Sequence, residues 1–330
     1  LGGHFENFSQ VICEFIDNSI ANFSQNQSPL TNIQITLEDL NGDVKVKIED
    51  TGSGIVDLDR CFSVGRTDEQ SPSLNEHGFG LKHALATADR ENLNWCISTR
   101  TTEDGSSFRM IKAKYLIRGF KGDKYALEEK DWPGDFQGTG SYIEFTADKD
   151  LFRTLSWGIR GVTTKFESLV DIFVQDLGFY YSGIISDAKA NIKVKTIVGE
   201  IKNLREVPSF EPDYIDHYEP GMGSDEIDLG SGTVKIKYNF GKITPKLDSK
   251  RFYKANMTSQ GVEIQLNGRV MEYALFDEIW SVERHNSYNP SLIQINVLSE
   301  NKASLPTTKT SKNGLRKEDV KTNALFNWIR

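Results

Sequence analysis

The sequence is poor in cysteine and has no long apolar run, and each shortage excludes a class of protein. Its only cysteines are Cys13, Cys61 and Cys96, and none stands in a CxxC or Cys/His cluster. They predict a reducing compartment, without a disulfide framework or a zinc site. No apolar run approaches the roughly 18–20 residues of a membrane span, and no signal peptide is evident. We therefore expect no membrane partner and a cytoplasmic protein, or a nuclear one if the source is eukaryotic.

Basic residues are also scarce relative to acidic ones, 39 against 47, which gives a net charge of −8. A protein that coats nucleic acid over its whole surface is therefore not expected, although a local basic patch is compatible with this charge. What is present, 38% hydrophobic and 11% aromatic residues, is ordinary for a folded chain. The length predicts about two domains of roughly 150 residues each.

Residue patterns predict a mixed α/β first half. Apolar residues recur at helical spacing over 7–23, with a polar stripe on the other side. Two alternating runs joined by Asn41-Gly42 predict a β-hairpin over 33–48. A helix pattern stands at 81–88, and strand patterns stand at 95–101, 107–118 and 141–146.

The second half is expected to be reached through a long helix over about 156–181, where apolar residues keep a spacing of three or four. The stretch 219–232 is rich in Gly, Asp and Glu and is interpreted as a flexible insertion. Strand patterns stand at 192–198, 233–240 and 261–266, with a helix pattern near 317–329. Because the last residues carry no polar tail, we expect the natural chain to continue past Arg330.

Two groups of polar residues in the first half can bind a ligand. Glu14 and Asn18 are four residues apart on the first helix, so they project from one face, although an ordinary exposed polar face is the alternative. Asp50 ends a predicted strand just before Gly52 and Gly54 let the backbone turn. A carboxylate there can accept a hydrogen bond from an exocyclic amine such as that of adenine. A plain turn is the alternative, whereas the further acidic ligands of an EF-hand are missing.

A third candidate is the glycine pair before the helix at 81–88, in Gly78-Phe79-Gly80-Leu81-Lys82. N–H groups at a helix start can bind phosphate with the help of the helix dipole, and Lys82 adds a positive charge. The alternative is a plain turn from loop to helix. The segment is neither a Walker A sequence nor the G-x-G-x-x-G of a dinucleotide fold.

Taken in order, four segments resemble the motifs of the GHKL, or Bergerat-fold, ATPases. They are E-F-I-D-N-S (14–19), D-T-G-S-G (50–54), H-G-F-G-L-K (77–82) and G-T-G-S (138–141). This superfamily includes gyrase, MutL, the ninety-kilodalton heat-shock chaperone, the histidine kinases and MORC proteins. The resemblance implies an α+β chain in which a Bergerat-type α/β sandwich binds ATP and Mg²⁺.

By this resemblance, Glu14 is the general base that activates the attacking water, and Asn18 binds the Mg²⁺ that bridges the phosphates. Histidine kinases use no such glutamate and need a phosphoacceptor histidine helix, and no histidine here lies in a matching sequence. Ala21 and Ser53 stand where gyrase-type members carry an Asp and an Arg. Losing both together removes a salt bridge without stranding a charge.

The adenine end is implied by the same motifs. Asp50 would read adenine, Gly52 and Gly54 would let the base approach closely, and Thr139 would support Asp50 through a water. The segment 61–76 corresponds to the ATP lid. Its phosphate-binding end comprises Gly78, Phe79, Gly80, Leu81 and Lys82.

The second half resembles a transducer domain. Q-G-V-E-I-Q-L-N-G-R (260–269) is similar to the G-(I/V)-x-(I/V)-x-x-N-x-R strand-turn of MORC and MutL proteins. The segment 305–314 resembles the loop that sends a lysine to the γ-phosphate, with Lys312 as first choice, Lys309 as the alternative and a solvated basic loop as the plain reading. The implied organisation is an ATP-binding domain at 1–150, a linking helix at 151–184 and a transducer-like α/β domain at 185–330.

The resemblance implies a slowly ATP-hydrolysing, MORC-like molecular clamp. Nucleotide would gate a conformational change or the formation of a homodimer. The implied partner is DNA, chromatin or a restriction or antiviral defence system. The alternatives are a chaperone ATPase of the heat-shock type and a non-hydrolysing, nucleotide-sensing subunit of a larger assembly.

Overall fold

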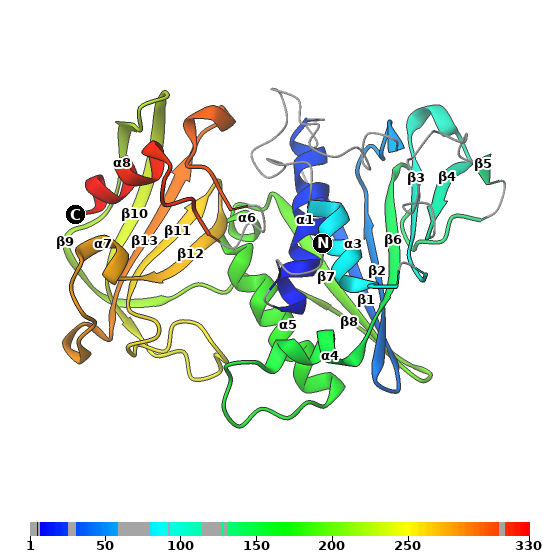
Figure 1. Cartoon of the computed structure of the whole chain (residues 1–330), viewed down its shortest axis with the longest axis horizontal. Helices are drawn as coiled ribbons and strands as arrows, with labels where there is room; N and C mark the ends of the chain where they lie inside the picture. The colour runs from blue at the N-terminus through cyan, green and yellow to red at the C-terminus, as the bar shows by residue number, and fades with distance from the viewer. Residues whose placement is uncertain are drawn as a thin grey trace. The chain divides into compact units, whose positions relative to one another are not determined.

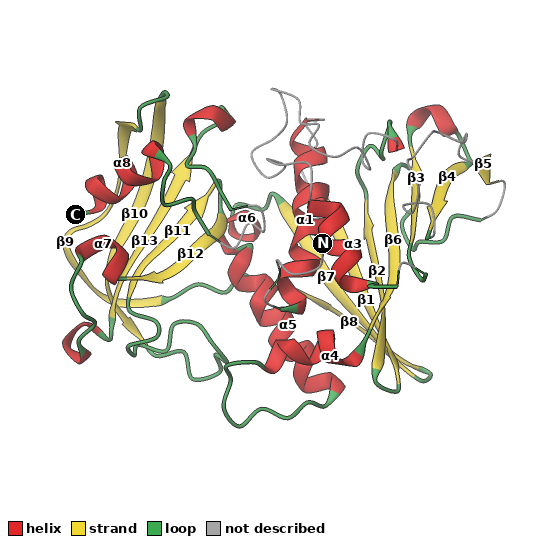
Figure 2. Cartoon of the chain, in the orientation of Figure 1, coloured by secondary structure: helices red, strands yellow, loops and turns green. Residues whose placement is uncertain are grey.

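The structure is a computed structural model that describes residues 5, 7–25, 31–58, 80–91, 93–113, 127–128, 131–309 and 314–330. The chain forms two compact units, each made of two segments. The first unit comprises Leu1–Val174 and Ala188–Val207, and the second comprises Gln175–Asp187 and Pro208–Arg330. Each unit combines one sheet with helices, which makes this an α+β chain as expected (Figure 1, Figure 2).

The sheet of the first unit has eight strands in the order β5-β4-β3-β6-β2-β1-β7-β8. The pair β1/β7 is parallel and the other neighbours are antiparallel. The strands are β1 (Thr31–Leu40), β2 (Asp43–Asp50), β3 (Cys96–Arg100), β4 (Phe108–Lys112), β5 (Leu127–Glu128), β6 (Gly140–Ala147), β7 (Ala190–Val198) and β8 (Ile201–Glu206).

Helices of the first unit cover one face of this sheet (Figure 2). They include α1 (Phe8–Gln25), α3 (Gly80–Ala88), α4 (Lys149–Arg153) and the first part of α5 (Phe166–Tyr180). Phe8 of α1 is fully buried and meets the rings of Phe152 and Phe173 edge-on, at centroid distances of 5.1 and 5.4 Å. Because α1 is mostly buried over residues 8–22, its polar residues there face protein atoms as well.

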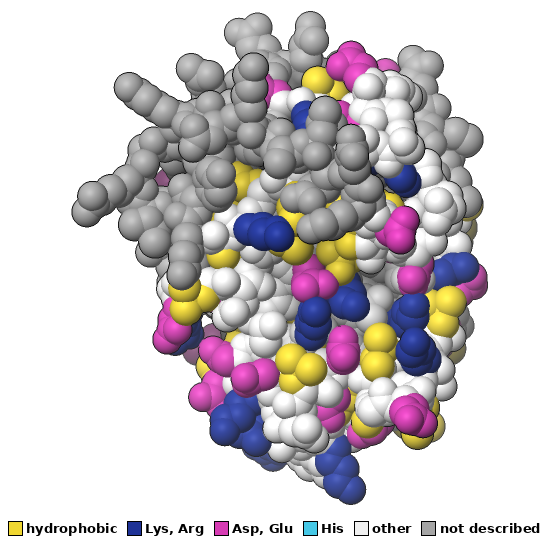
Figure 3. All heavy atoms as spheres, turned by 90° about the vertical axis from the view of Figure 1, so that its right-hand side faces the viewer, with side chains coloured by type: hydrophobic (Ala, Val, Ile, Leu, Met, Phe, Trp, Pro, Cys, Tyr) yellow, Lys and Arg dark blue, Asp and Glu magenta, His cyan; other side chains and the backbone are white. Residues whose placement is uncertain are grey.

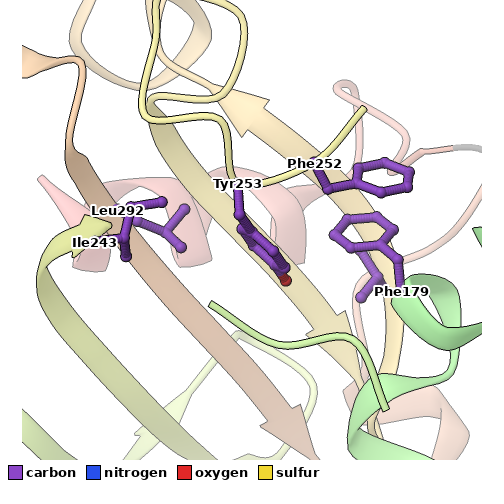
Figure 4. Close-up of a cluster of buried hydrophobic side chains, with 6 residues drawn as sticks. Phe179, Ile243, Phe252, Tyr253 and Leu292 are labelled. Atoms are coloured by element: carbon purple, nitrogen blue, oxygen red, sulfur yellow. The ribbon is translucent and has the colours of Figure 1, made fainter. Parts of the chain in front are cut away.

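The sheet of the second unit has five strands in the order β12-β11-β13-β10-β9. Its strands and helices are β9 (Asp213–Asp228), β10 (Thr233–Thr244), β11 (Gly261–Leu266), β12 (Arg269–Leu275), β13 (Ser291–Leu298), α6 (Ser182–Ser186), α7 (Asp277–Trp280) and α8 (Val320–Ile329). Part of its core is an aromatic cluster in which Phe179 stacks on Phe252 with ring centroids 3.6 Å apart (Figure 4). Tyr253, Ile243 and Leu292 complete the labelled set, so this unit has a core of its own.

The strongly periodic predictions are confirmed. The first helix, the hairpin of β1 and β2, the helix after Gly80 and the turn at Asn267-Gly268 between β11 and β12 all lie where the sequence placed them. Among the helices that the structure describes, none has both the length and the hydropathy of a membrane span.

The long helix expected over 156–181 is wrong in its first third, because α5 begins only at Phe166. Gly158 and Gly161 have positive φ angles of 75° and 73°, which a right-handed helix does not contain. The apolar spacing of Ile159 and Val162 therefore belongs to a turn segment.

The flexible insertion expected over 219–232 is also wrong for most of its length. Residues up to Asp228 belong to β9, which pairs with β10 along an irregular antiparallel ladder. Its residues are largely exposed, so the sequence lacks the alternation of buried apolar residues that marks a strand.

The strand expected over 192–198 is present as β7, but it pairs with β1 in the sheet of the first unit. The sequence had assigned it to the second half. The domain boundaries expected near residues 150 and 185 stay a prediction. In the structure, the chain passes from one compact unit to the other after residues 174, 187 and 207.

Candidate functional site

The carboxylate of Asp50 lies at the end of a central strand of the first sheet and accepts three hydrogen bonds. Asp50 ends β2 and is only 5% exposed. Its Oδ1 accepts hydrogen bonds from the backbone N–H groups of Gly52 at 2.8 Å and Ser141 at 3.3 Å. Its Oδ2 accepts one from the hydroxyl of Ser19 on α1 at 2.8 Å. The helix, the loop after β2 and the start of β6 thus all orient this one side chain.

Burial raises the pKa of Asp50 above its ordinary value, because the charged form loses its hydration. The hydrogen bonds from Gly52, Ser19 and Ser141 oppose part of that shift. An acceptor held in this way can recognise an amine donor, as the sequence analysis expected of it.

The D-T-G-S-G loop is fastened to α1 and to β3. Asn22 of α1 donates from Nδ2 to the carbonyl of Gly54 and accepts from the hydroxyl of Ser53. Gly54 has a φ of +77°, and a Cβ there would collide with the carbonyl oxygen of Arg100. The glycine is therefore needed both for the backbone angle and for the close approach to β3.

Arg109 of β4 holds the residues that follow this loop. Its guanidinium donates to the carbonyl oxygens of Ile55 at 2.9 Å and Val56 at 2.8 Å, and it forms an ion pair with Asp104. The chain is thus held at Ile55 and Val56, two residues before Leu58, the last described residue before the predicted lid.

Glu14 and Gly80 lie next to each other, although 65 residues separate them in the sequence. Glu14 is 1% exposed, so the ordinary exposed face weighed for it is excluded. Gly80 is the first residue of α3, and a Cβ at that position would collide with Oε2 of Glu14. The start of α3 and the glutamate of α1 therefore lie side by side, and their shared role in one site stays a prediction.

The other predicted residues are placed as follows. Asn18 stands one turn after Glu14 and is half-buried, as are Leu81 and Lys82 in the first turn of α3. Thr139 is half-buried and lies just before β6. Gly78 and Phe79, the lid at 61–76 and Lys312 lie outside the described residues.

Three contributors were not singled out from the sequence: Ser19, Asn22 and Arg109. Asn22 follows Glu14 and Asn18 at the same four-residue step, so the helical spacing carried the signal for it. Ser19 closes the quoted motif E-F-I-D-N-S without having been given a role of its own, and Arg109 lies outside the four motifs.

In the second unit, Lys309 lies at the base of the loop expected to carry the γ-phosphate lysine. Its backbone N–H donates to the carbonyl of Gly314 at 2.8 Å, and Thr308 and Leu315 form an antiparallel bridge. The N–H of Leu315 donates to Oε1 of Glu272 on β12 at 2.6 Å. Burial raises the pKa of Glu272, and the charge of Lys309 opposes that shift.

The second unit also contains a carboxylate that is wholly buried, Glu263 in the middle of β11. Its Oε2 accepts from the hydroxyl of Tyr253 at 2.6 Å. Its Oε1 accepts from the side-chain amides of Gln265 at 2.8 Å and Gln294 at 3.0 Å. Burial raises the pKa of Glu263.

The first unit is an α/β domain with two buried carboxylates near glycine motifs, and a comparison of sequences gives its family. Residues 3–115 match the family described as histidine kinase-, DNA gyrase B-, and HSP90-like ATPase. This part of the chain therefore belongs to that family, which is the GHKL superfamily expected from the motifs. No curated protein matches the chain in sequence.

Three solved structures have a low overall similarity to this chain. The B-subunit of DNA gyrase from Myxococcus xanthus has a TM-score of 0.49 at 8% identity, covering 97% of this chain and 87% of that one. The N-terminal domain of a DNA repair protein has 0.46 at 13%, covering 89% and 85%. The Aquifex aeolicus MutL ATPase domain complexed with ADP has 0.39 at 9%, covering 89% and 92%. At these values the family assignment depends on the sequence match alone.

Proposed function

We propose that this chain is a slowly ATP-hydrolysing molecular clamp of the MORC and MutL type. The observation that carries the proposal is the pairing of two buried carboxylates with two glycine motifs at one edge of the first unit. Asp50 is aimed by three donors, and Glu14 lies against the first residue of α3. One carboxylate is suited to the base of the nucleotide and the other to its reacting end.

The side chains present fit ATP and Mg²⁺. Asp50 would accept from the adenine amine, with Gly52, Gly54 and Thr139 around it. Lys82 and the N–H groups at the start of α3 would bind phosphate, together with Gly78, Phe79, Gly80 and Leu81. Asn18 would supply an amide oxygen, a ligand type that Mg²⁺ accepts beside phosphate oxygens and waters. When bound, Mg²⁺ would neutralise charge on the phosphates.

Glu14 would orient the attacking water and accept its proton at a carboxylate oxygen. Its burial beside Gly80 would keep bulk water away from that oxygen. Lys312, or Lys309 in its place, would contribute a positive charge from the second unit. ATP binding would then favour a closed state or a homodimer, and hydrolysis would release it.

DNA, chromatin or a defence complex is the partner class we propose for the clamp. The net charge of −8 requires a local binding surface for DNA. On the face drawn in Figure 3, Lys and Arg side chains are interspersed with Asp and Glu, which does not mark that face as such a surface.

Calorimetric titration with a non-hydrolysable ATP analogue tests nucleotide binding, and sedimentation with and without the analogue tests closure into a dimer. We expect binding with Mg²⁺ and a larger species in its presence, with DNA retained in a parallel run. Absence of binding would overturn the proposal. Protection of unfolding clients would favour the chaperone alternative, and tight binding with zero turnover would favour the sensor.

A further inference from the structure

The two last residues of β2 are both buried carboxylates, and they serve opposite faces of the sheet. Asp50 points to the face covered by α1, where it meets Ser19. Glu49 precedes it in the strand and therefore points to the other face. Glu49 is 4% exposed, and none of the functional roles proposed above uses it.

On that other face, Glu49 holds the segment 131–137, which leads into the G-T-G-S motif. Its Oε1 accepts from Nε1 of Trp132 at 3.2 Å and from the N–H of Phe136 at 2.6 Å. Its Oε2 accepts from the N–H of Asp135 at 2.8 Å. A Cβ at Gly134 would collide with Oε1 of Glu49, so the segment approaches the carboxylate as closely as its backbone allows.

Arg100 connects Trp132 to the G-T-G-S motif. Arg100, the last residue of β3, lies over the ring of Trp132, with Cζ 4.8 Å from the ring centroid. Its Nε donates to the carbonyl of Gly138. Three residues later, the N–H of Ser141 donates to Oδ1 of Asp50. A continuous set of contacts therefore runs from Glu49 around the edge of the sheet and back to its neighbour Asp50.

We propose that Glu49 is a positioning residue for adenine recognition. It fixes the 131–139 segment, and that segment sets the position of the Ser141 N–H that aims the Asp50 carboxylate. Glu49 itself touches neither the base nor the phosphates. This inference rests on the proposed function, since it needs Asp50 to read adenine.

The test compares Glu49→Gln with wild type by calorimetric titration with ATP and with GTP analogues. Glutamine has one acceptor oxygen and an NH₂ group, so at least one of the three donors loses its acceptor. We expect the Kd for the ATP analogue to rise about tenfold at unchanged stoichiometry, on the scale of one lost charged hydrogen bond. The preference for ATP over GTP should fall with it, because guanine carries no amine where Asp50 would accept one.

Two further variants separate positioning from general stability. Gly134→Ala removes no donor or acceptor but forces the segment away from Glu49, and it should weaken ATP binding in the same way. Glu144→Gln is the matched control, since Glu144 lies on the same face and bonds to Tyr142 and Lys45 instead. It should leave the nucleotide preference unchanged.

The proposal is overturned if Glu49→Gln lowers the melting temperature but keeps the Kd and the nucleotide preference of wild type. It is also overturned if Glu144→Gln changes the preference as much as Glu49→Gln does. Failure of the proposed function would look different, because wild type itself would then not bind the ATP analogue.

Discussion

The regions around Asp50 and Glu263 both bury a carboxylate, yet they satisfy it in different ways. Glu263 lies in the middle of a strand and is surrounded by side-chain donors from Tyr253, Gln265 and Gln294. Asp50 ends a strand and is held mainly by two backbone N–H groups, one in the loop after β2 and one at the start of β6, with one hydroxyl from a helix. Glu263 therefore belongs to a hydrogen-bond network inside its unit, whereas the Asp50 carboxylate is held in one orientation at the end of strand β2.

This difference supports the ligand role that we propose for Asp50 and not for Glu263. A buried carboxylate whose hydrogen bonds all come from side chains of the same unit stabilises that unit, and it has no side open to a ligand. Backbone donors from a loop and from the start of a strand fix a side chain without surrounding it, as in a preorganised site. Four measurements can sharpen or break this comparison.

The largest expected effect is on the rate of ATP hydrolysis, and it comes from changing Glu14, the second buried carboxylate of the first unit. Glu14→Ala should lower the ATPase rate about a thousandfold, the scale of a lost general base, while ATP binding is retained. A coupled phosphate-release assay and a calorimetric titration would measure the two quantities. Normal hydrolysis in the variant would mean that the base has been assigned wrongly.

Glu263→Ala should affect stability instead. Three buried donors would lose their acceptor and a cavity would open, at a cost of about 3 kcal/mol in the free energy of unfolding. Urea unfolding would measure that cost, and a titration of the folded variant should give the wild-type Kd for ATP. A weakened Kd in fully folded protein would contradict the division between the two regions.

Asp50→Asn should have the complementary effect. An amide presents a donor where the adenine amine needs an acceptor, so the Kd for ATP should rise on the order of tenfold to a hundredfold. Calorimetry would measure the change. An unaltered affinity would remove the adenine role from Asp50 and, with it, the basis for the role of Glu49.

The smallest effect is a pH dependence of stability. Burial raises the pKa of Glu263 above its ordinary value of 4.5, so the folded state holds this proton more tightly than the unfolded state. The resulting stability is complete below about pH 4.5 and is lost as the pH rises through the folded pKa, at no more than about 1.4 kcal/mol per pH unit.

Glu263→Gln should remove this contribution. The unfolding free energy of wild type minus that of the variant should therefore decrease between pH 4 and pH 7, as measured by urea unfolding at both values. A difference that increases with pH would show that the hydrogen bonds to the charged form outweigh its desolvation.

The sequence predicted the parts of this molecule whose signal is local. The spacing of apolar residues over 7–23 and 33–48 was enough to place α1 and the first hairpin, because burial on one face imposes a period. The motif order also led us to expect Glu14 and Gly80 together, and the structure places them side by side. The family match over 3–115 confirms the superfamily that the motifs indicated.

What the sequence missed depends on partners distant in the chain. β9 is largely exposed and pairs with β10, so its composition resembles that of a loop. Ile159 and Val162 keep helical spacing, but two glycines with positive φ prevent a helix. Glu49 points to the opposite face from Asp50, and that became informative once residues 132–136 were located beside it.

The parallel pairing of β1 with β7 has a consequence for how this protein can be divided and made. Residues 31–38 in the middle of the first unit pair with residues 190–197, while 175–187 between them belong to the second unit. A fragment ending at 150 or at 185 would leave β1 with a bare edge. During synthesis the first sheet remains incomplete until the ribosome has passed residue 206, the end of β8. Expression trials of the nucleotide-binding part alone should therefore include residues up to at least 207.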